Sequence, residues 1–495
     1  MLACVWATLY PHVKDFWSTP ISARPVALMR LVFGAVVLAG VLMNIAPSLL
    51  FFWGSDGMVP TETASRYAEY NDRISVFSLA DSDAATVCWL VLYCITLVMV
   101  TIGCFTRVAC AAAWLFAMSF SMRGWWVTNG GDDVTVIMLF YLMLTPCGAT
   151  WSVDSLRRRL KDYKDPASGF DSPGSSIYVS ERSGIVNVLD NQIAPWSVRL
   201  MQIQLCLIYF YNGLNKINVG DLSSWQAFID ANDYLSGKAV YYALNDNMLN
   251  RVPYDAMPIP FWICCLLSWA TIVFEVGFPL LIMFRRVRPW MIVAGIGFHI
   301  GILITMEIGW FSQTMIAVYP VLLSGVGATA VVAFLARCGA RRKYRLFYDT
   351  FCPICRRSKM VLDLMDIGGR LEFRDIHDRE AMEREAPGVS YSRALKEMIV
   401  VRPSGKIDGG YYAFRTIAKG LPSLWPVMVL MYVPGVSWVG SRLYKMFARN
   451  RYRFKACDGD VCNLHLRALS QEHIEESEIM AIISRAREAA KVAVE

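Results

Sequence analysis

The distribution of apolar residues divides the chain into a long membrane-like part and a shorter polar part. Eight apolar runs have the length of membrane spans or come close to it, and the third is the shortest. They cover residues 26–49, 84–105, 108–122, 133–149, 198–215, 261–284, 290–308 and 312–336. The pattern therefore predicts a polytopic α-helical membrane bundle with about eight transmembrane helices in contact with the lipid bilayer.

After residue 340 the pattern becomes that of a soluble α/β domain. Strands are predicted over 344–348, 371–375 and 398–401, and helices over 358–365 and 412–419. A strand, a CxxC motif, a helix and a second strand in this order are typical of a thioredoxin-like fold. We therefore predict three regions: a transmembrane domain over 1–340, a thioredoxin-like domain over 341–470 and an amphipathic C-terminal helix over 471–495.

Two other segments are not assigned to membrane spans. Residues 1–17 are predicted to form an amphipathic interfacial helix that is retained, because no basic stretch is followed by a small-residue cleavage site. Residues 421–439 are apolar but contain Pro422, Pro426 and Pro434. These prolines favour buried helices or a flap on the membrane over a ninth span.

The charged residues limit the class of protein and predict its orientation. Of the 495 residues, 55% are hydrophobic and only 18% are charged, which excludes one large soluble globule. The net charge of +7 comes from clusters beside the apolar runs, so it does not indicate nucleic-acid binding. With eight spans these clusters fall on one side, which predicts a multi-pass inner-membrane protein with both termini and the CxxC domain in the cytoplasm. The clusters are Lys14 with Arg24, Arg107, and the basic residues within 157–164, 285–288 and 341–343.

The side opposite to the basic clusters is predicted to face outward. Polar segments on this side lie next to ionisable residues of the apolar runs. Asn212 lies three residues from Asn215 and four from Lys216, so the three share one side of a helix. An ionisable group inside a membrane is costly unless it is paired or hydrated, which predicts a polar cavity around Lys216. The alternative is that these groups only tie helices together. The expected supporting residues are Asn212, Asn215, Glu275, His299 and Asp132.

Residues 348–357, with the sequence YDTFCPICRR, contain the clearest chemical motif of the chain. Cys352 is expected at the N-terminus of a helix, where the helix dipole favours the thiolate, and Cys355 is placed to resolve a mixed disulfide. Asp349 and Pro353 are the neighbours of this redox motif. We therefore predict a dithiol site that exchanges electrons with a thiol partner protein.

A zinc site is the alternative interpretation of these two cysteines. Cys457 and Cys462 would have to complete it, but their spacing fits a zinc ribbon poorly, so no metal is predicted. Those two could also form a pair or be unrelated thiols. Most of the other cysteines lie in or beside apolar runs, where packing explains them.

The soluble part resembles the DCC-type thiol–disulfide oxidoreductases over about residues 342–455. The resemblance rests on Tyr-Asp before Cys-Pro-x-Cys, on residues 408–410 and Ala413, and on the closing segment 444–454. This sequence has Thr350 and Phe351 where that family usually has glycine and a polar residue. The resemblance implies a thioredoxin-like fold, with Cys352 as the attacking thiol and Cys355 as the resolving thiol.

The membrane part resembles the HTTM family, which is related to vitamin K-dependent γ-carboxylase, over about residues 20–335. In the carboxylases a lysine at the Gly-Leu-Asn-Lys position acts as a general base on reduced vitamin K. The resemblance implies this role for Lys216 and a reduced quinone of the vitamin K or menaquinone type as the cofactor. The matching segments are 23–34, 56–60, 129–132, 151–154, 202–216, 274–279 and residue 299 followed by 310–312.

Three hypotheses follow from these observations. The first is a membrane enzyme that handles a quinone-like cofactor around Lys216, fused to a cytoplasmic dithiol oxidoreductase. The second is a membrane module that binds or moves a small lipophilic ligand, with the thiol domain as a redox sensor. The third treats both parts as scaffolds, in which case serine at Cys352 would change nothing.

Overall fold

The computed structural model divides the chain into two compact units. The first comprises Met1–Arg157 and Asp190–Ala328, and the second comprises Arg158–Leu189 and Thr329–Glu495. The structure describes residues 13–58, 60, 63, 66, 75–80, 82–162, 192–217, 224, 229, 232–246, 248–251, 259–337, 343–350, 352–366, 369–421, 424, 428 and 431–450. Cys457, Cys462, most of the predicted N-terminal interfacial helix and the predicted C-terminal helix lie outside these residues.

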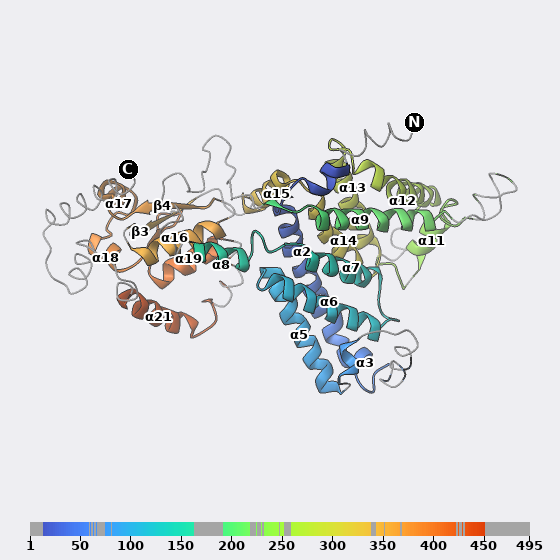
Figure 1. The fold of residues 1–495 in the computed structure, drawn as a ribbon, viewed down its shortest axis with the longest axis horizontal. Helices are drawn as coiled ribbons and strands as arrows, with labels where there is room; N and C mark the ends of the chain where they lie inside the picture. Colours follow the sequence, from blue (N-terminus) through green and yellow to red (C-terminus); the bar gives the residue numbers. More distant parts are fainter. Residues whose placement is uncertain are drawn as a thin grey trace. The chain divides into compact units, whose positions relative to one another are not determined.

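The described part of the first unit is almost entirely helical (Figure 1). Its two short strands, β1 (Ile21–Ser22) and β2 (Gln192–Ile193), pair in antiparallel fashion. Two helices, α8 and α15, run across the boundary between the units. The helices are α2 (Arg24–Gly40), α3 (Leu49–Trp53), α5 (Asp83–Ile102), α6 (Thr106–Arg123), α7 (Gly130–Leu144), α8 (Val153–Asp162), α9 (Trp196–Asn215), α11 (Lys238–Asn245), α12 (Phe261–Leu281), α13 (Arg288–Thr305), α14 (Phe311–Val318) and α15 (Gly325–Arg337).

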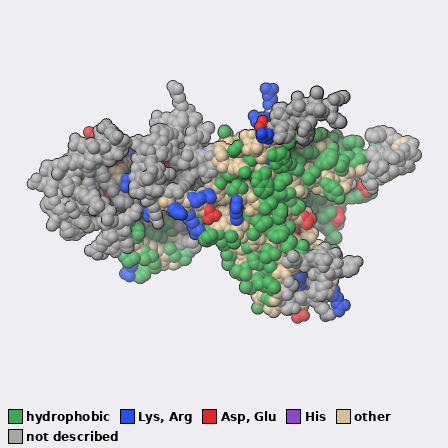
Figure 2. Space-filling model, in the orientation of Figure 1, with side chains coloured by type: hydrophobic (Ala, Val, Ile, Leu, Met, Phe, Trp, Pro, Cys, Tyr) green, Lys and Arg blue, Asp and Glu red, His purple; other side chains and the backbone are tan. Residues whose placement is uncertain are grey.

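Four helical segments are long and apolar enough to cross a membrane, judged by length and composition. They are Arg24–Trp53, Asp83–Ile102, Phe261–Leu281 and Arg288–Thr305. Their outward side chains are apolar, as on α12 and α13, where Trp262, Val273 and Trp290 are more than half exposed. Hydrophobic side chains accordingly predominate on the face of the first unit that Figure 2 shows. This surface is that of a protein embedded in lipid.

The prediction of about eight transmembrane helices is not confirmed. Among the described residues, helices occupy all eight predicted regions, but only four meet the criteria for a span. The region predicted as one span over 312–336 contains two shorter apolar helices, Phe311–Leu322 and Gly325–Leu335. A 3₁₀ turn over Tyr319–Leu322 contains Pro320 and ends α14, because proline has no N–H for the helical ladder.

Arg30 holds three chain segments together in the interior of the first unit. Its side chain is fully buried, and its Nη1 donates to the carbonyls of Val100 and Thr101 at 2.6 and 2.7 Å. Nη2 donates to the carbonyl of Trp151 at 2.6 Å and Nε to that of Cys147 at 3.2 Å. A guanidinium at the C-terminal end of α5 satisfies carbonyls that have no helical partner and complements the helix dipole.

The second unit is built on a four-stranded mixed sheet with the strand order β4-β3-β5-β6. β3 (Tyr344–Tyr348) is parallel to β4 (Leu371–Asp375) and antiparallel to β5 (Ile399–Val401), which pairs with β6 (Ile407–Gly409). The other elements are helices, labelled in Figure 1: α16 (Pro353–Met365), α17 (Arg379–Glu385), α18 (Tyr391–Lys396), α19 (Tyr411–Gly420) and α21 (Val436–Asn450).

Alternation along β3 gives the sheet an apolar core on each face. Leu346 packs with Leu362 of α16 and Ile417 of α19 in one cluster. Phe347, the next residue, belongs to the other cluster, with Met382 of α17 and Leu395 of α18. The predicted strands over 344–348 and 371–375 are confirmed, and α16 begins five residues earlier than predicted.

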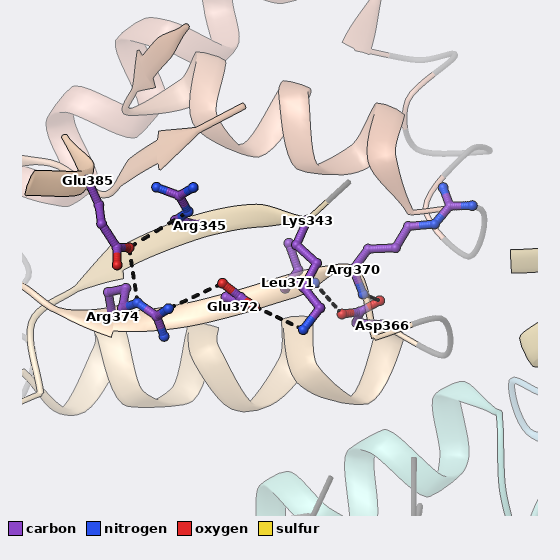
Figure 3. A network of polar contacts seen from close by, with 8 residues as sticks. All are labelled: Lys343, Arg345, Asp366, Arg370, Leu371, Glu372, Arg374 and Glu385. Carbon is purple, nitrogen blue, oxygen red and sulfur yellow. Dashed lines mark hydrogen bonds and ion pairs between the residues drawn. The ribbon is translucent and has the colours of Figure 1, made fainter. Parts of the chain in front are cut away.

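Charged residues form a ladder along the edge strand β4 and its neighbour β3 (Figure 3). Arg374 lies between Glu372 and Glu385, with N···O distances of 3.2 and 3.1 Å. The hydrogen bond from Lys343 lowers the pKa of Glu372. Asp366 accepts from the backbone N–H of Arg370 and Leu371 and so shapes the turn into β4, although burial raises its pKa.

Candidate functional site

The first unit contains a large, partly open cavity with a mainly apolar lining. Its volume is about 1550 Å³, and α6, α7, α9, α11, α12, α13 and α14 contribute to its wall. Such a volume is above the usual range of small-molecule pockets and suits a long apolar ligand. The polar residues in the lining include Tyr209, Asn212, Lys216, Tyr234, Glu275 and His299.

Lys216 and Glu275 form an ion pair in the wall of this cavity. The Nζ of Lys216 lies 2.6 Å from Oε2 of Glu275, and the two side chains are only 18% and 7% exposed. The same Nζ lies 3.5 Å from the backbone carbonyl of Asn212 and 5.4 Å from the ring centroid of Tyr234. A buried carboxylate and a buried ammonium group offset each other's desolvation, so each depends on the other.

Gly213 explains why Lys216 reaches Glu275. A Cβ atom at Gly213 would lie 3.0 Å from both the Cβ of Glu275 and the backbone nitrogen of Val276. Only glycine therefore allows α9 to pack this closely on α12. Lys216 follows the last residue of α9, where its ammonium group also complements the negative end of the helix dipole.

His299 belongs to a second polar cluster in the same cavity. Its Nε2 lies 2.6 Å from the hydroxyl of Tyr209, which lies 2.7 Å from the hydroxyl of Tyr319. Gly295 makes room for this cluster, because a Cβ there would lie 1.8 Å from the hydroxyl of Tyr319. Tyr209 is seven residues before Lys216 on α9, so the two clusters are roughly 10 Å apart along that helix.

The other residues predicted around Lys216 have different positions. Asn212 lines the cavity, but its amide nitrogen donates to the carbonyl of Ile208. Asn215 is exposed at the end of α9. Asp132 accepts from the backbone N–H of Asn129 in a capping box at the start of α7, and it lines a separate, smaller cavity.

The CxxC motif forms the start of α16 in the second unit. Cys352 is the N-cap residue, and its Sγ accepts from the backbone N–H of Cys355 at 3.4 Å. Pro353 occupies the first turn, as is common where an N–H would have no helical acceptor. Cys352 and Cys355 are 1% and 6% exposed, so the dithiol site is largely covered.

A buried hydrogen-bonded chain lies directly beside Cys352. Oδ1 of Asp349 accepts from the backbone N–H of Cys352 at 3.3 Å and lies 3.1 Å from Nε2 of His377. Nδ1 of His377 lies 2.8 Å from the hydroxyl of Tyr391, whose pKa is raised by burial. Asp349 and His377 are 2% and 4% exposed. This chain joins the dithiol motif to the loop after β4 and to α18.

Sequence reasoning missed His377 and Tyr391. His377 follows β4 by two residues, and no spacing relative to the cysteines marks it. The parallel pairing of β3 and β4 is the signal that could have identified His377. Tyr348 pairs with Asp375, so the residues that follow the two strands lie close together. The described residues include no cluster of three or more His, Cys, Asp or Glu side chains that could hold a metal ion.

The apolar helices together with the dithiol motif at a helix start identify the chain as a membrane protein with a redox domain. Residues 184–325 match the family model of the HTTM domain, and residues 346–456 match that of the DCC1-like thiol-disulfide oxidoreductases. The chain thus combines an HTTM domain with a DCC1-like domain in that order, which confirms the predicted fusion. No curated protein and no solved structure matches it.

The matched ranges include most of the candidate residues. Lys216, Glu275 and His299 fall within the HTTM match, and Cys352 and Cys355 fall within the DCC1-like match. Asp132 precedes the HTTM match. The resemblance predicted for the part of the chain before residue 184 stays a prediction.

Proposed function

We propose that the second unit is a thiol–disulfide oxidoreductase that uses Cys352 and Cys355. The observation that carries this proposal is the position of Cys352 as N-cap of α16, with Asp349 and His377 beside it. The positive end of the helix dipole stabilises a thiolate at this position. The sheet order, with one parallel and two antiparallel pairings, supports a thioredoxin-like fold.

The proposed reaction has two exchange steps. The Cys352 thiolate attacks a substrate disulfide, forms a mixed disulfide and releases one substrate thiol. The Cys355 thiolate then attacks Sγ of Cys352, which releases the second substrate thiol and leaves a Cys352–Cys355 disulfide. Two electrons pass to the substrate, whose two sulfurs each take a proton. A thiol partner protein restores the dithiol.

Reduction of a model disulfide by the purified full chain tests this proposal. We expect Cys352→Ser to abolish the activity, because no attacking thiol remains. Cys355→Ser should accumulate the mixed disulfide, which mass spectrometry would detect. Cys88→Ser, a change at an exposed cysteine of α5, is the matched control and should keep the wild-type rate. Full activity of Cys352→Ser would exclude the proposed site.

For the first unit, we infer that the cavity binds a quinone-type lipophilic cofactor. Its apolar lining and volume of about 1550 Å³ fit a ring with a prenyl tail. Within the described residues Nδ1 of His299 is buried without a hydrogen-bond partner. If Tyr209 donates to Nε2, Nδ1 carries a proton and can donate to a quinone oxygen.

A carboxylase-like role for Lys216 requires a neutral amine. In the ion pair the proton would first move from Nζ of Lys216 to Oε2 of Glu275, over the 2.6 Å that separates them. The neutral amine could then take a proton from a quinol hydroxyl. Glu275 would therefore act as the proton acceptor that prepares the base, a role supported by its burial and by its contact with Lys216.

The second candidate function is binding or movement of a lipophilic ligand without turnover. The observation that favours it is that Lys216 is already engaged as a donor to Glu275, which is how a structural or ligand-orienting lysine would be held. The dithiol domain would then act as a redox sensor. Both candidates use the same cavity and differ only in whether the ligand reacts.

Oxidation of added menaquinol or vitamin K quinol separates the two candidates. For the enzyme we expect wild type in aerated buffer to oxidise the quinol with molecular oxygen, which also supplies the epoxide oxygen, and we expect a loss of at least about 10²-fold in Lys216→Ala, the usual contribution of a general base. Lys238→Ala on α11 is the matched control and should not change the rate. No turnover by wild type would favour the binding module.

The orientation is part of the same proposal. With eight spans, the basic clusters favour an inner-membrane protein with the dithiol domain in the cytoplasm and Lys216 towards the outer face. The two sites would then communicate only through a membrane-soluble carrier, for which a quinone is suitable.

A further inference from the structure

Helix α21 presents its large apolar side chains outward instead of towards the domain. Its partly buried positions carry small or polar residues, which are Ser437, Gly440, Ser441, Tyr444 and Ala448. Its exposed side carries Trp438, Val439, Leu443, Met446 and Phe447, with exposed fractions between 46% and 61%. A helix that only covered a soluble domain would have the reverse arrangement.

The inward side of α21 packs closely on α19, which fixes the outward direction of the apolar side. A Cβ at Gly440 would lie 2.3 Å from the ring of Tyr411. The hydroxyl of Tyr444 accepts from the backbone N–H of Met398 at 3.2 Å, and Ser437 accepts from Arg415. Figure 2 shows hydrophobic side chains with basic ones beside them over α21, which Figure 1 labels.

The charge of this part of the chain indicates what the apolar side contacts. Residues 409–457 contain no Asp or Glu and eight Lys or Arg. Arg442 and Lys445 are exposed on α21, and Arg442 stacks on Trp438 at 3.9 Å. Tryptophan, aliphatic residues and basic residues on one side of a helix are the composition that binds an anionic lipid surface.

The chain connection keeps this domain close to a bilayer. The apolar helix Gly325–Leu335 lies only eight residues before the first strand of the sheet, β3. Residues 336–343 can extend at most about 30 Å. A bilayer that holds this apolar helix is therefore within reach of the domain.

We propose that the outward side of α21 binds the surface of an anionic bilayer and so holds the dithiol domain at the membrane. The apolar side chains enter the boundary between headgroups and acyl chains, and Arg442 and Lys445 pair with lipid phosphates. This proposal concerns the placement of the domain and stands whether or not the cavity of the first unit turns over a quinol.

Photo-crosslinking of the full chain tests the proposal. Leu443→p-benzoylphenylalanine places the probe at the centre of the outward side, and Arg384→p-benzoylphenylalanine on α17 is the control on the opposite face of the sheet. In nanodiscs containing phosphatidylglycerol, we expect lipid adducts at position 443 and none at 384. Circular dichroism and a monodisperse elution profile confirm that both variants fold.

Other occupants of this side would overturn the proposal. The proposal would be wrong if position 443 formed an adduct with residues 451–495, with a second copy of the chain or with another protein. It would also be wrong if position 443 formed no adduct at all. A second variant tests the charge: Arg442→Gln with Lys445→Gln should lower the yield of lipid adduct on the order of tenfold. An unchanged yield would contradict a role for the anionic headgroups.

Discussion

At the scale of single residues, Asp349 connects the dithiol motif to the rest of its domain. Its carboxylate holds the backbone N–H of Cys352 and contacts His377, which in turn contacts Tyr391. A buried carboxylate this close to a thiol affects both the position of the sulfur and the route by which a proton leaves it. Asp349 is therefore a positioning residue for the proposed exchange.

We predict that Asp349→Asn slows disulfide reduction by about 10²-fold and moves its pH profile, because the amide keeps the size of the side chain but removes its charge. The measurement is the rate of model-disulfide reduction between pH 5 and pH 9. Asp363→Asn is the control: Asp363 is a half-buried residue of α16 that pairs with Lys359, and its loss should leave the profile unchanged. An unchanged profile for Asp349→Asn would exclude the proposed role.

At the scale of elements, the close contact between α9 and α12 creates the site around Lys216. The two helices approach at Gly213, and the ion pair to Glu275 forms one turn further along. The sequence could predict that Lys216 and Glu275 are polar residues in apolar helices. It could not predict that these helices are neighbours, because helix pairing depends on contacts between distant segments.

Gly213→Ala tests this contact. We predict that the variant is less stable by about 1–3 kcal/mol, because the added methyl group meets backbone and Cβ atoms of α12. Thermal unfolding in detergent, followed by tryptophan fluorescence, measures the loss. Gly277→Ala on α12 is the control, since its Cβ would meet only Leu281 at 3.5 Å. A melting temperature of Gly213→Ala equal to that of the control would refute the proposed close approach.

Secondary structure could be predicted from the sequence where one physical signal dominates. β3 alternates between two apolar clusters, and β4 alternates apolar Leu371 and Phe373 with charged residues, so the period of both strands is clear. β6, with the sequence IDG, was missed because Asp and Gly usually indicate a turn. The predicted span over 312–336 was wrong as a single helix, because the segment that begins at Phe311 tightens into a 3₁₀ turn with Pro320, ends at Leu322, and is followed by a new helix from Gly325.

At the scale of the whole molecule, the chain joins a membrane unit with an apolar cavity to a unit with a buried dithiol. The order of the two families could be predicted because their motifs are local. The separation of the polar residues into two clusters could not, since Glu275 and His299 lie on different helices that contact different parts of α9. The function of the membrane unit depends on what the cavity holds.

Binding of menaquinone to the purified full chain, measured by native mass spectrometry in detergent, tests this account most directly. We predict one quinone per chain for wild type and for Lys238→Ala. Lys216→Ala should bind at least about tenfold more weakly, because it leaves Glu275 buried in the cavity wall without its partner. No quinone bound to wild type, or equal binding by Lys216→Ala, would contradict the proposed role of the cavity.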